Sequence, residues 1–165
     1  MKKNRLFWLV AIVGFLWDQG TKVWVVESFN EIGETIALWE DVFHFTYVIN
    51  TGAAFSLFAD NGRWLRWLSL AVTLGLMIFA WLSPRLLKLE QLGYGLVLAG
   101  AAGNGLDRFL FGYVVDFLDF RLIQFPVFNV ADICINIGII FLIITNLPYF
   151  QRSHRPRNGE QNRNE

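Results

Sequence analysis

The stretch NGLDRFLFGYVVDFLDFRLIQFPVFNVAD, residues 104–132, places four carboxylates, two asparagines and two arginines between two of the most apolar segments of the chain. An unpaired charge inside a membrane-spanning segment costs about 3 kcal/mol on insertion scales. Polar groups this concentrated beside apolar segments therefore indicate a functional site near a membrane surface. The carboxylates are those of Asp107, Asp116, Asp119 and Asp132.

The composition of the whole chain is typical of a membrane protein. Of its 165 residues, 55% are hydrophobic and only 17% are charged, and the mean hydropathy is +0.41, which disfavours a single soluble domain. The formal net charge is zero, and no basic stripe indicates a nucleic-acid partner. Cys134, the only cysteine, lies in an apolar run, so we expect a small core side chain and neither a disulfide nor a thiolate metal cluster.

Four apolar segments each approach the roughly 20 residues needed to cross the ~30 Å hydrocarbon core. The first follows a basic N-terminus and lacks a small-residue cleavage site, so we expect a retained helix and not a cleaved signal peptide. The second stops at Ser83-Pro84, the third is rich in glycine and alanine, which lets membrane helices approach closely, and the fourth ends at Pro148. The predicted spans are residues 6–26, 64–82, 92–110 and 128–147.

Lysine and arginine set the predicted orientation, because both are enriched in cytoplasmic loops. They precede the first span, separate the second from the third and follow the fourth, so we predict that both termini are cytoplasmic. The outer segments are then residues 27–63, which are strongly acidic, and 107–127. Residues 1–150 form one predicted membrane domain, and the polar residues 151–165 form a predicted disordered cytoplasmic tail. The basic residues used here are Lys2, Lys3, Arg5, Arg85, Lys88, Arg152, Arg155 and Arg157.

One part of the first outer segment has the pattern of a β-strand. In FHFTYVI, residues 43–49, four apolar residues alternate with His44, Thr46 and Val48, which is the two-residue period of a strand with one apolar face. We therefore predict a small extracytoplasmic β-sheet whose aromatic rings lie at the lipid interface. The predicted fold class is an α-helical integral membrane protein with four transmembrane helices and this sheet.

Polar residues at helical spacing occur in the first and third spans. Asp18 and Lys22 are four residues apart and should form an ion pair, which either tethers this helix to its neighbours or faces the substrate. Asn104, Asp107 and Arg108 share one helical face at the end of the third span. The guanidinium of Arg108 is a fork of donors that suits either Asp107 or a lipid phosphate.

The fourth span contains a polar stripe at the same spacing. Asn129, Asp132 and Asn136 should face the bundle interior, and Asn129 is also a good candidate for the helix N-cap. No cationic residue lies in this span. The partner of Asp132 must therefore come from another part of the chain.

The segment VVDFLDF, residues 114–120, surrounds Asp116 and Asp119 with apolar side chains. Partial desolvation raises the pKa of a carboxyl group and favours sharing a proton with a second acid, as in an aspartic protease, where an ionised aspartate takes a proton from water and a protonated one donates to the scissile carbonyl. Spacing alone leaves any pair among the four aspartates possible, and capping or ion pairing is the simpler interpretation of each one singly.

Other catalytic schemes lack the residues they need. Serine chemistry lacks a base, because His44 lies in the predicted strand and His154 in the predicted tail. A zinc site lacks a histidine pair at helical spacing.

Taken together and in order, five motifs resemble those of the bacterial lipoprotein signal peptidases, also called signal peptidase II. They are DQGTK at 18–22, NTGAAFS at 50–56, GNGLDR at 103–108, GYVVDFLDF at 112–120 and FNVAD at 128–132, and the resemblance covers about residues 8–150. It implies an aspartic endopeptidase of the bacterial inner membrane that removes the signal peptide from diacylglyceryl-modified prolipoproteins, cutting just before the lipidated cysteine on the extracytoplasmic side. It also implies inhibition by globomycin and no need for a metal or organic cofactor. As partners we expect membrane lipids and no nucleic acid, and we expect a monomer although the sequence does not fix the oligomeric state.

Carried over motif by motif, the resemblance implies that Asp116 and Asp132 are the catalytic pair. It implies substrate-binding or supporting roles for Asp18, Lys22, Asn50, Gly52, Asn104, Asp107, Arg108 and Asn129.

The residues alone also leave two other functions open. One is a small transporter or proton channel, because intramembrane carboxylates also mark ion pathways, although the acids cluster towards one face and no repeated half with broken helices is visible. The other is a non-catalytic assembly factor in which the polar stripe holds helices together.

Overall fold

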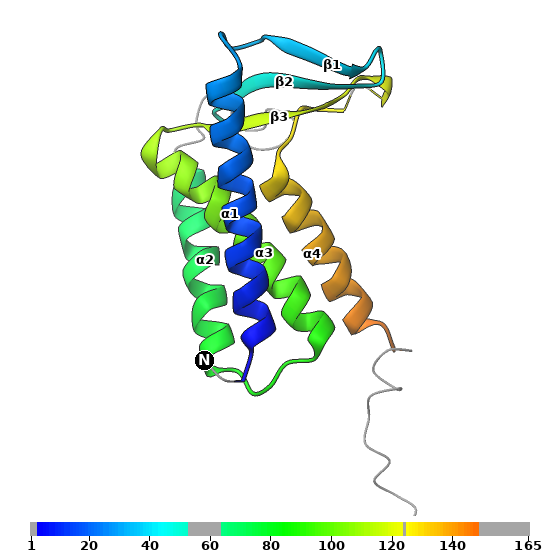
Figure 1. Cartoon of the computed structure of the whole chain (residues 1–165). Coiled ribbons are helices and arrows are strands. Elements are labelled where there is room, and N and C mark those ends of the chain that lie inside the picture. Colours follow the sequence, from blue (N-terminus) through cyan, green and yellow to red (C-terminus); the bar gives the residue numbers. More distant parts are fainter. Residues whose placement is uncertain (1–2, 53–63, 124, 149–165) are drawn as a thin grey trace, which may run out of the picture.

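The computed structural model describes residues 3–52, 64–123 and 125–148, which form four helices beneath a three-stranded antiparallel sheet (Figure 1). The predicted tail and residues 53–63, with the second half of the NTGAAFS motif, lie outside the described residues. The helices are α1 (Arg5–Ser28), α2 (Leu65–Leu82), α3 (Lys88–Leu110) and α4 (Val130–Asn146), and the strands are β1 (Thr35–Trp39), β2 (Phe43–Asn50) and β3 (Val114–Phe120), followed by the short 3-10 helix η3 (Arg121–Ile123).

All four predicted helices are present, with ends that local hydrogen bonds explain. Helix α3 begins four residues before its predicted start, because the Glu90 carboxylate accepts a hydrogen bond from the Leu87 N–H at 2.8 Å and caps its first turn. Helix α4 begins two residues later than predicted, because Asn129 is its N-cap. After α3, Gly112 adopts a φ of 83°, a left-handed conformation that suits glycine and turns the chain into β3.

Helix α3 is central and packs against α1, α2 and α4. A Cβ on Gly95 would lie 2.7 Å from the Phe7 carbonyl oxygen of α1, and a Cβ on Gly100 would collide with the Ala131 carbonyl oxygen of α4. The small residues of α3 therefore allow the close approach of helices that the sequence predicts. Cys134, as expected, is buried in the core that these helices share with the sheet.

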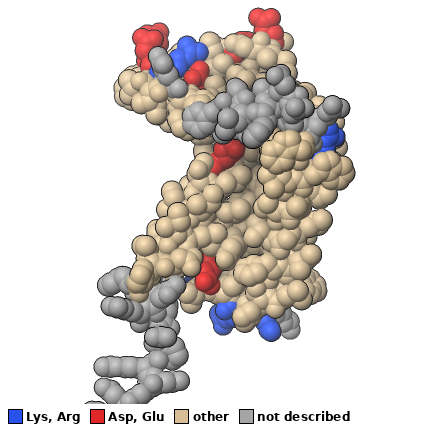
Figure 2. All heavy atoms as spheres, turned by 180° about the vertical axis from the view of Figure 1, so that it is seen from behind, with Lys and Arg blue, Asp and Glu red and all other residues tan. Residues whose placement is uncertain are grey.

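The outer surfaces of the helices are apolar. Leu16 in α1, Leu82 in α2 and Ile143 in α4 are 61%, 76% and 58% exposed, and Figure 2 shows a broad uncharged surface with most of the lysine, arginine, aspartate and glutamate side chains towards its two ends. Among the described residues, α1 and α2 are long and apolar enough to cross a membrane, and α4 is a shorter apolar helix. These surfaces are those of a membrane protein.

The predicted strand at residues 43–49 is confirmed as β2, the middle strand of the sheet β1-β2-β3. The predicted alternation, however, is interrupted. Phe45 lies opposite Leu118, but the register with β3 then shifts by one residue and Val48 lies opposite Asp116, the place that Tyr47 would take in an unbroken ladder. Tyr47 instead packs in the core below the sheet, so one apolar face does not run the length of the strand.

Candidate active site

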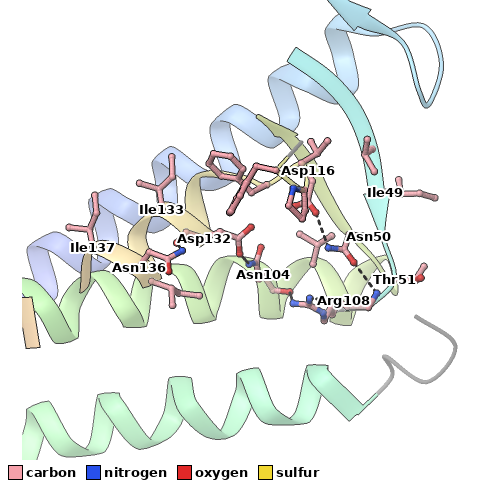
Figure 3. A pocket seen from close by; sticks show the side chains of 18 residues that line it. Ile49, Asn50, Thr51, Asn104, Arg108, Asp116, Asp132, Ile133, Asn136 and Ile137 are labelled. Carbon is pink, nitrogen blue, oxygen red and sulfur yellow. Dashed lines mark hydrogen bonds between the residues drawn. The ribbon is translucent and has the colours of Figure 1, made fainter. Parts of the chain in front are cut away.

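Asp116 and Asp132 line the same cavity, which has a volume of about 840 Å³ and lies between the sheet, α3 and α4 (Figure 3). Asp116 comes from the middle of β3 and is 2% exposed, and Asp132 comes from the first turn of α4 and is half-buried. Asn50, Asn104 and Arg108 lie at the polar end of the cavity. Its wall along α4 is mainly apolar and is formed by Ile133, Ile135 and Ile137, with Asn136 among them.

The other two aspartates of the 104–132 stretch do not line this cavity. Asp119 is three positions from Asp116 on β3, so its side chain lies on the opposite face of the strand. There it forms an ion pair with Arg121 at 3.0 Å and accepts a hydrogen bond from the Thr46 hydroxyl at 2.7 Å. Asp107 forms an ion pair with Lys22. Of the six pairs that the four aspartates could form, only Asp116 and Asp132 therefore share this cavity.

The chain that follows η3 returns to the sheet and brings the start of α4 beside β3. Phe128 and Leu118 exchange two backbone hydrogen bonds, of 3.1 and 2.8 Å. Asn129 therefore lies next to Asp116, and its Nδ2 donates to Asp116 Oδ1 at 2.6 Å.

Asn129 also fixes the second aspartate through the helix cap. Its Oδ1 accepts a hydrogen bond from the Asp132 N–H at 3.0 Å, and its own N–H donates to Asp132 Oδ2 at 3.2 Å. This reciprocal pair is a capping box. The sequence suggested Asn129 as a cap or as a site residue; the structure confirms the cap, and the same side chain also bonds Asp116.

Asn104 of α3 completes the connection between the two acids. Its Nδ2 donates to Asp132 Oδ1 at 2.8 Å, and its Oδ1 accepts from Asn129 Nδ2 at 3.0 Å. The partner from another part of the chain that Asp132 requires is therefore an amide, and no ion pair to Asp132 occurs in the described part of the chain.

Lys22 lies behind Asn104 and is 4% exposed. Its Nζ donates to Asn104 Oδ1 at 2.9 Å and forms ion pairs with Asp18 at 2.9 Å and Asp107 at 2.8 Å. Asp18 in turn accepts a hydrogen bond from the Ala131 N–H at 2.8 Å, which joins α1 to the first turn of α4. Of the two roles considered for Asp18 and Lys22, the structure favours the tether, because neither residue lines the cavity.

The polar end of the cavity is held by Asn50, Gly52 and Arg108. Asn50 Nδ2 donates to Asp116 Oδ2 at 2.9 Å, while its Oδ1 accepts from the Gly52 N–H at 3.0 Å. Arg108 donates to the carbonyl oxygens of Gly52 and Asn104, at 2.9 and 3.2 Å. Arg108 therefore braces backbone at this end of the cavity and makes no ion pair with Asp107.

Burial and charge both act on Asp116. Desolvation and the nearby negative charge of Asp132 raise the pKa of Asp116 to about 7, against hydrogen bonds from Asn50 and Asn129 and the more distant charge of Lys22, which lower it. One of two neighbouring carboxyl groups is thus poised to hold a proton near neutral pH, which is the electrostatic requirement of an aspartic protease pair.

Gln19 is a residue that the sequence reasoning passed over. Its Nε2 donates to Asp18 Oδ2 at 3.0 Å and to Asp107 Oδ1 at 3.1 Å. Its position next to Asp18, as a polar amide inside an apolar span, is the sequence feature that could have predicted its role in this network. Across the described residues, no group of three or more histidine, cysteine, aspartate or glutamate side chains could hold a metal ion.

A family model for signal peptidase (SPase) II matches residues 10–148. The chain belongs to the signal peptidase II family. Lipoprotein signal peptidases from Gloeothece citriformis and Microcystis aeruginosa are 67% and 64% identical to it over 148 and 151 residues, which cover 90% and 92% of this chain and 92% and 97% of theirs. A bacterial membrane enzyme of known structure is 28% identical, with a TM-score of 0.78 and 92% of each chain covered.

As a signal peptidase II, the chain is an aspartic peptidase, so the family predicted from the five motifs is confirmed. The transporter and the assembly factor are therefore set aside. The matched range includes all ten residues that the motifs single out.

Proposed function

We propose that this protein removes the signal peptide from prolipoproteins whose cysteine carries diacylglycerol, cutting just before that cysteine, and that Asp116 and Asp132 are its catalytic pair. The observation that carries the proposal is that these two aspartates line one cavity and are connected through Asn129. The similarity to lipoprotein signal peptidases supports the substrate class.

In the proposed mechanism, the two carboxyl groups share a lytic water. Asp132 is the ionised member and takes a proton from this water. Asp116, whose pKa is raised to about 7, is the protonated member and donates to the oxygen of the scissile carbonyl. The amides of Asn50, Asn104 and Asn129 hold the carboxyl groups in position, so little reorganisation is needed when the substrate binds.

The shape and chemistry of the cavity suit a substrate that is partly lipid. The isoleucines of α4 provide an apolar wall for the signal peptide and acyl chains, and the carboxyl groups lie at the end next to the sheet, where the peptide bond can meet water. Asn50, Gly52 and Arg108 lie where the extended substrate backbone would need hydrogen-bond partners. The remaining predicted supporting residues act through these groups: Asp18, Lys22 and Asp107 anchor Asn104 and the start of α4.

We further propose that the protein is a monomer of the bacterial inner membrane in which all four helices cross the bilayer. The start of α1 and the end of α4 lie at the same end of the molecule, opposite the sheet (Figure 1), which agrees with cytoplasmic termini and an extracytoplasmic site. Residues 1–150 would form this single membrane domain.

The test is cleavage of a diacylglyceryl-modified prolipoprotein in detergent by the wild type and by Asp116→Asn and Asp132→Asn. Loss of a general acid or base costs on the order of 10²- to 10⁴-fold in rate. We therefore expect each variant to lose at least about 100-fold. Asp119→Asn is the matched control, because it makes the same change in the same strand but outside the cavity, and it should cleave within a few-fold of the wild type.

Each variant must show the same cooperative thermal unfolding as the wild type for its rate to be interpreted. A folded Asp116→Asn or Asp132→Asn variant that cleaves at the wild-type rate would disprove the catalytic assignment. Cleavage by the wild type at a bond other than the one before the lipidated cysteine would instead disprove the proposed specificity.

A further inference from the structure

A second cavity, of about 480 Å³, lies at the end of the helices opposite the sheet. It is formed where the start of α1 meets the connection between α2 and α3. Four of the six residues that line it are cations, and the full set is Lys3, Arg5, Leu6, Arg85, Lys88 and Gln91.

The four cations have no ion-pair partner among the described residues. All four are exposed, so burial does not force their charges together. Glu90 is the one acidic residue in the first turn of α3, and its carboxylate is bonded to the Leu87 N–H. An excess of positive charge therefore remains around the cavity, and an anion bound there would be attracted to it.

The backbone adds to this positive charge. Arg5 and Lys88 are the first residues of α1 and α3, where the helix dipole is positive and a cation is unfavourable. Asn4 does not cap α1 with its side chain. Its Nδ2 donates to the carbonyl oxygens of Ala80 and Pro84, and its Oδ1 accepts from the Leu86 N–H. Two helix N-termini and four cations thus meet at one cavity, an arrangement that an anion would stabilise.

The surroundings of the cavity indicate an anion that belongs to a lipid. Trp8, two residues after Leu6 in α1, and Trp81, at the end of α2 and four residues before Arg85, border an apolar groove with Leu82, as aromatic residues do at a membrane interface. Leu6 contributes an apolar side chain to the cavity itself. The arginine forks match the oxygens of a phosphate.

We propose that this cavity binds the phosphate group of an anionic membrane phospholipid. The proposal rests on the placement of the helices in a membrane and not on the peptidase reaction, so it stands or falls separately from the catalytic assignment. The lipid would neutralise the cations and fix the connection between α2 and α3 to the start of α1.

The test uses the full-length protein in neutral detergent, with thermal unfolding followed during titration with phosphatidylglycerol. The pocket variant is Arg5→Gln with Arg85→Gln. The control variant, Arg66→Gln with Arg121→Gln, also removes two positive charges, but near the sheet and away from the cavity. Because each cation near a membrane anion contributes about fivefold in affinity, the pocket variant should need about thirtyfold more lipid for the same rise in unfolding temperature.

The wild type and the control variant should respond alike to phosphatidylglycerol, and neither should respond to zwitterionic phosphatidylcholine. Equal responses of the pocket variant and the control variant would overturn the site. An equal response to phosphatidylcholine would overturn its requirement for an anionic lipid. A rise produced by inorganic phosphate alone, at concentrations equal to those of the lipid, would overturn the lipid assignment in favour of a soluble anion.

Discussion

Replacement of Lys22 by methionine tests how much the buried ion pairs beside the candidate site stabilise the fold. The substitution keeps a long apolar side chain but removes two ion pairs, of 2.9 and 2.8 Å, and the hydrogen bond to Asn104. It leaves the carboxylates of Asp18 and Asp107 buried, with 0% and 3% of their surface exposed. Breaking a buried pair by removing one partner costs about 3–5 kcal/mol.

For a chain of this size, 1 kcal/mol corresponds to about 2–4 °C in Tm, so Lys22→Met should unfold roughly 6–20 °C below the wild type. The assay is thermal unfolding in detergent, followed by a fluorescence signal that does not require labelling of the buried Cys134 thiol. Arg121→Met is the control, because Arg121 belongs to an ion pair in which it is 39% exposed, and such pairs contribute about 0–1 kcal/mol. Adding Asp107→Asn to Lys22→Met should recover part of the loss. If Lys22→Met unfolds within about 2 °C of the wild type, or no lower than Arg121→Met, the reasoning is refuted.

Three further outcomes are expected. The cleavage rate should fall about tenfold per pH unit above about pH 7, because the proton on Asp116 is lost as the pH rises through its raised pKa of about 7; a rate that stays level up to about pH 9 in a pH–rate profile would contradict this. Asn129→Ala removes the cap of α4 and a hydrogen bond to the proposed catalytic pair. It should lower Tm, and because it misplaces an acid it should lower cleavage about 100-fold, whereas Asn146→Ala at the other end of α4 should leave both unchanged. Gly103→Ala would press a Cβ against a buried carboxylate of α1 and should lower Tm, while Gly75→Ala meets nothing within 4 Å and should not; equal Tm values for the two alanine variants would count against the packing described for α3.

Much of this fold follows from patterns that are local in the sequence. The four helices follow from apolar runs bounded by proline, glycine and polar residues, and β2 from a two-residue alternation. The ion pair of Asp18 with Lys22 follows from their spacing on one helix. Such features depend on residues within one or two turns of each other, so a single sequence contains the information needed to predict them.

The choice of Asp116 and Asp132 could not be made from spacing, because it depends on contacts between distant segments. The shift in register between β2 and β3 is one cause. It places Asn50 opposite Val114, on the same face of the sheet as Asp116, whereas an unbroken ladder would turn Asn50 to the other face. The return of the chain at Phe128 to pair with Leu118 is another. The choice of Asp116 and Asp132 from the sequence therefore rests on the resemblance to the signal peptidase II motifs and not on periodicity.

The double role of Asn129 has a consequence for how the site forms. Asn129 caps the first turn of α4 through Asp132 and also bonds Asp116, so formation of this first turn and assembly of the proposed catalytic pair are coupled. Fraying of the first turn would take the acids apart without unfolding the rest of the bundle. Hydrogen–deuterium exchange at the Asp132 amide would then measure how often the first turn of α4 opens and separates the two acids while the rest of the protein stays folded.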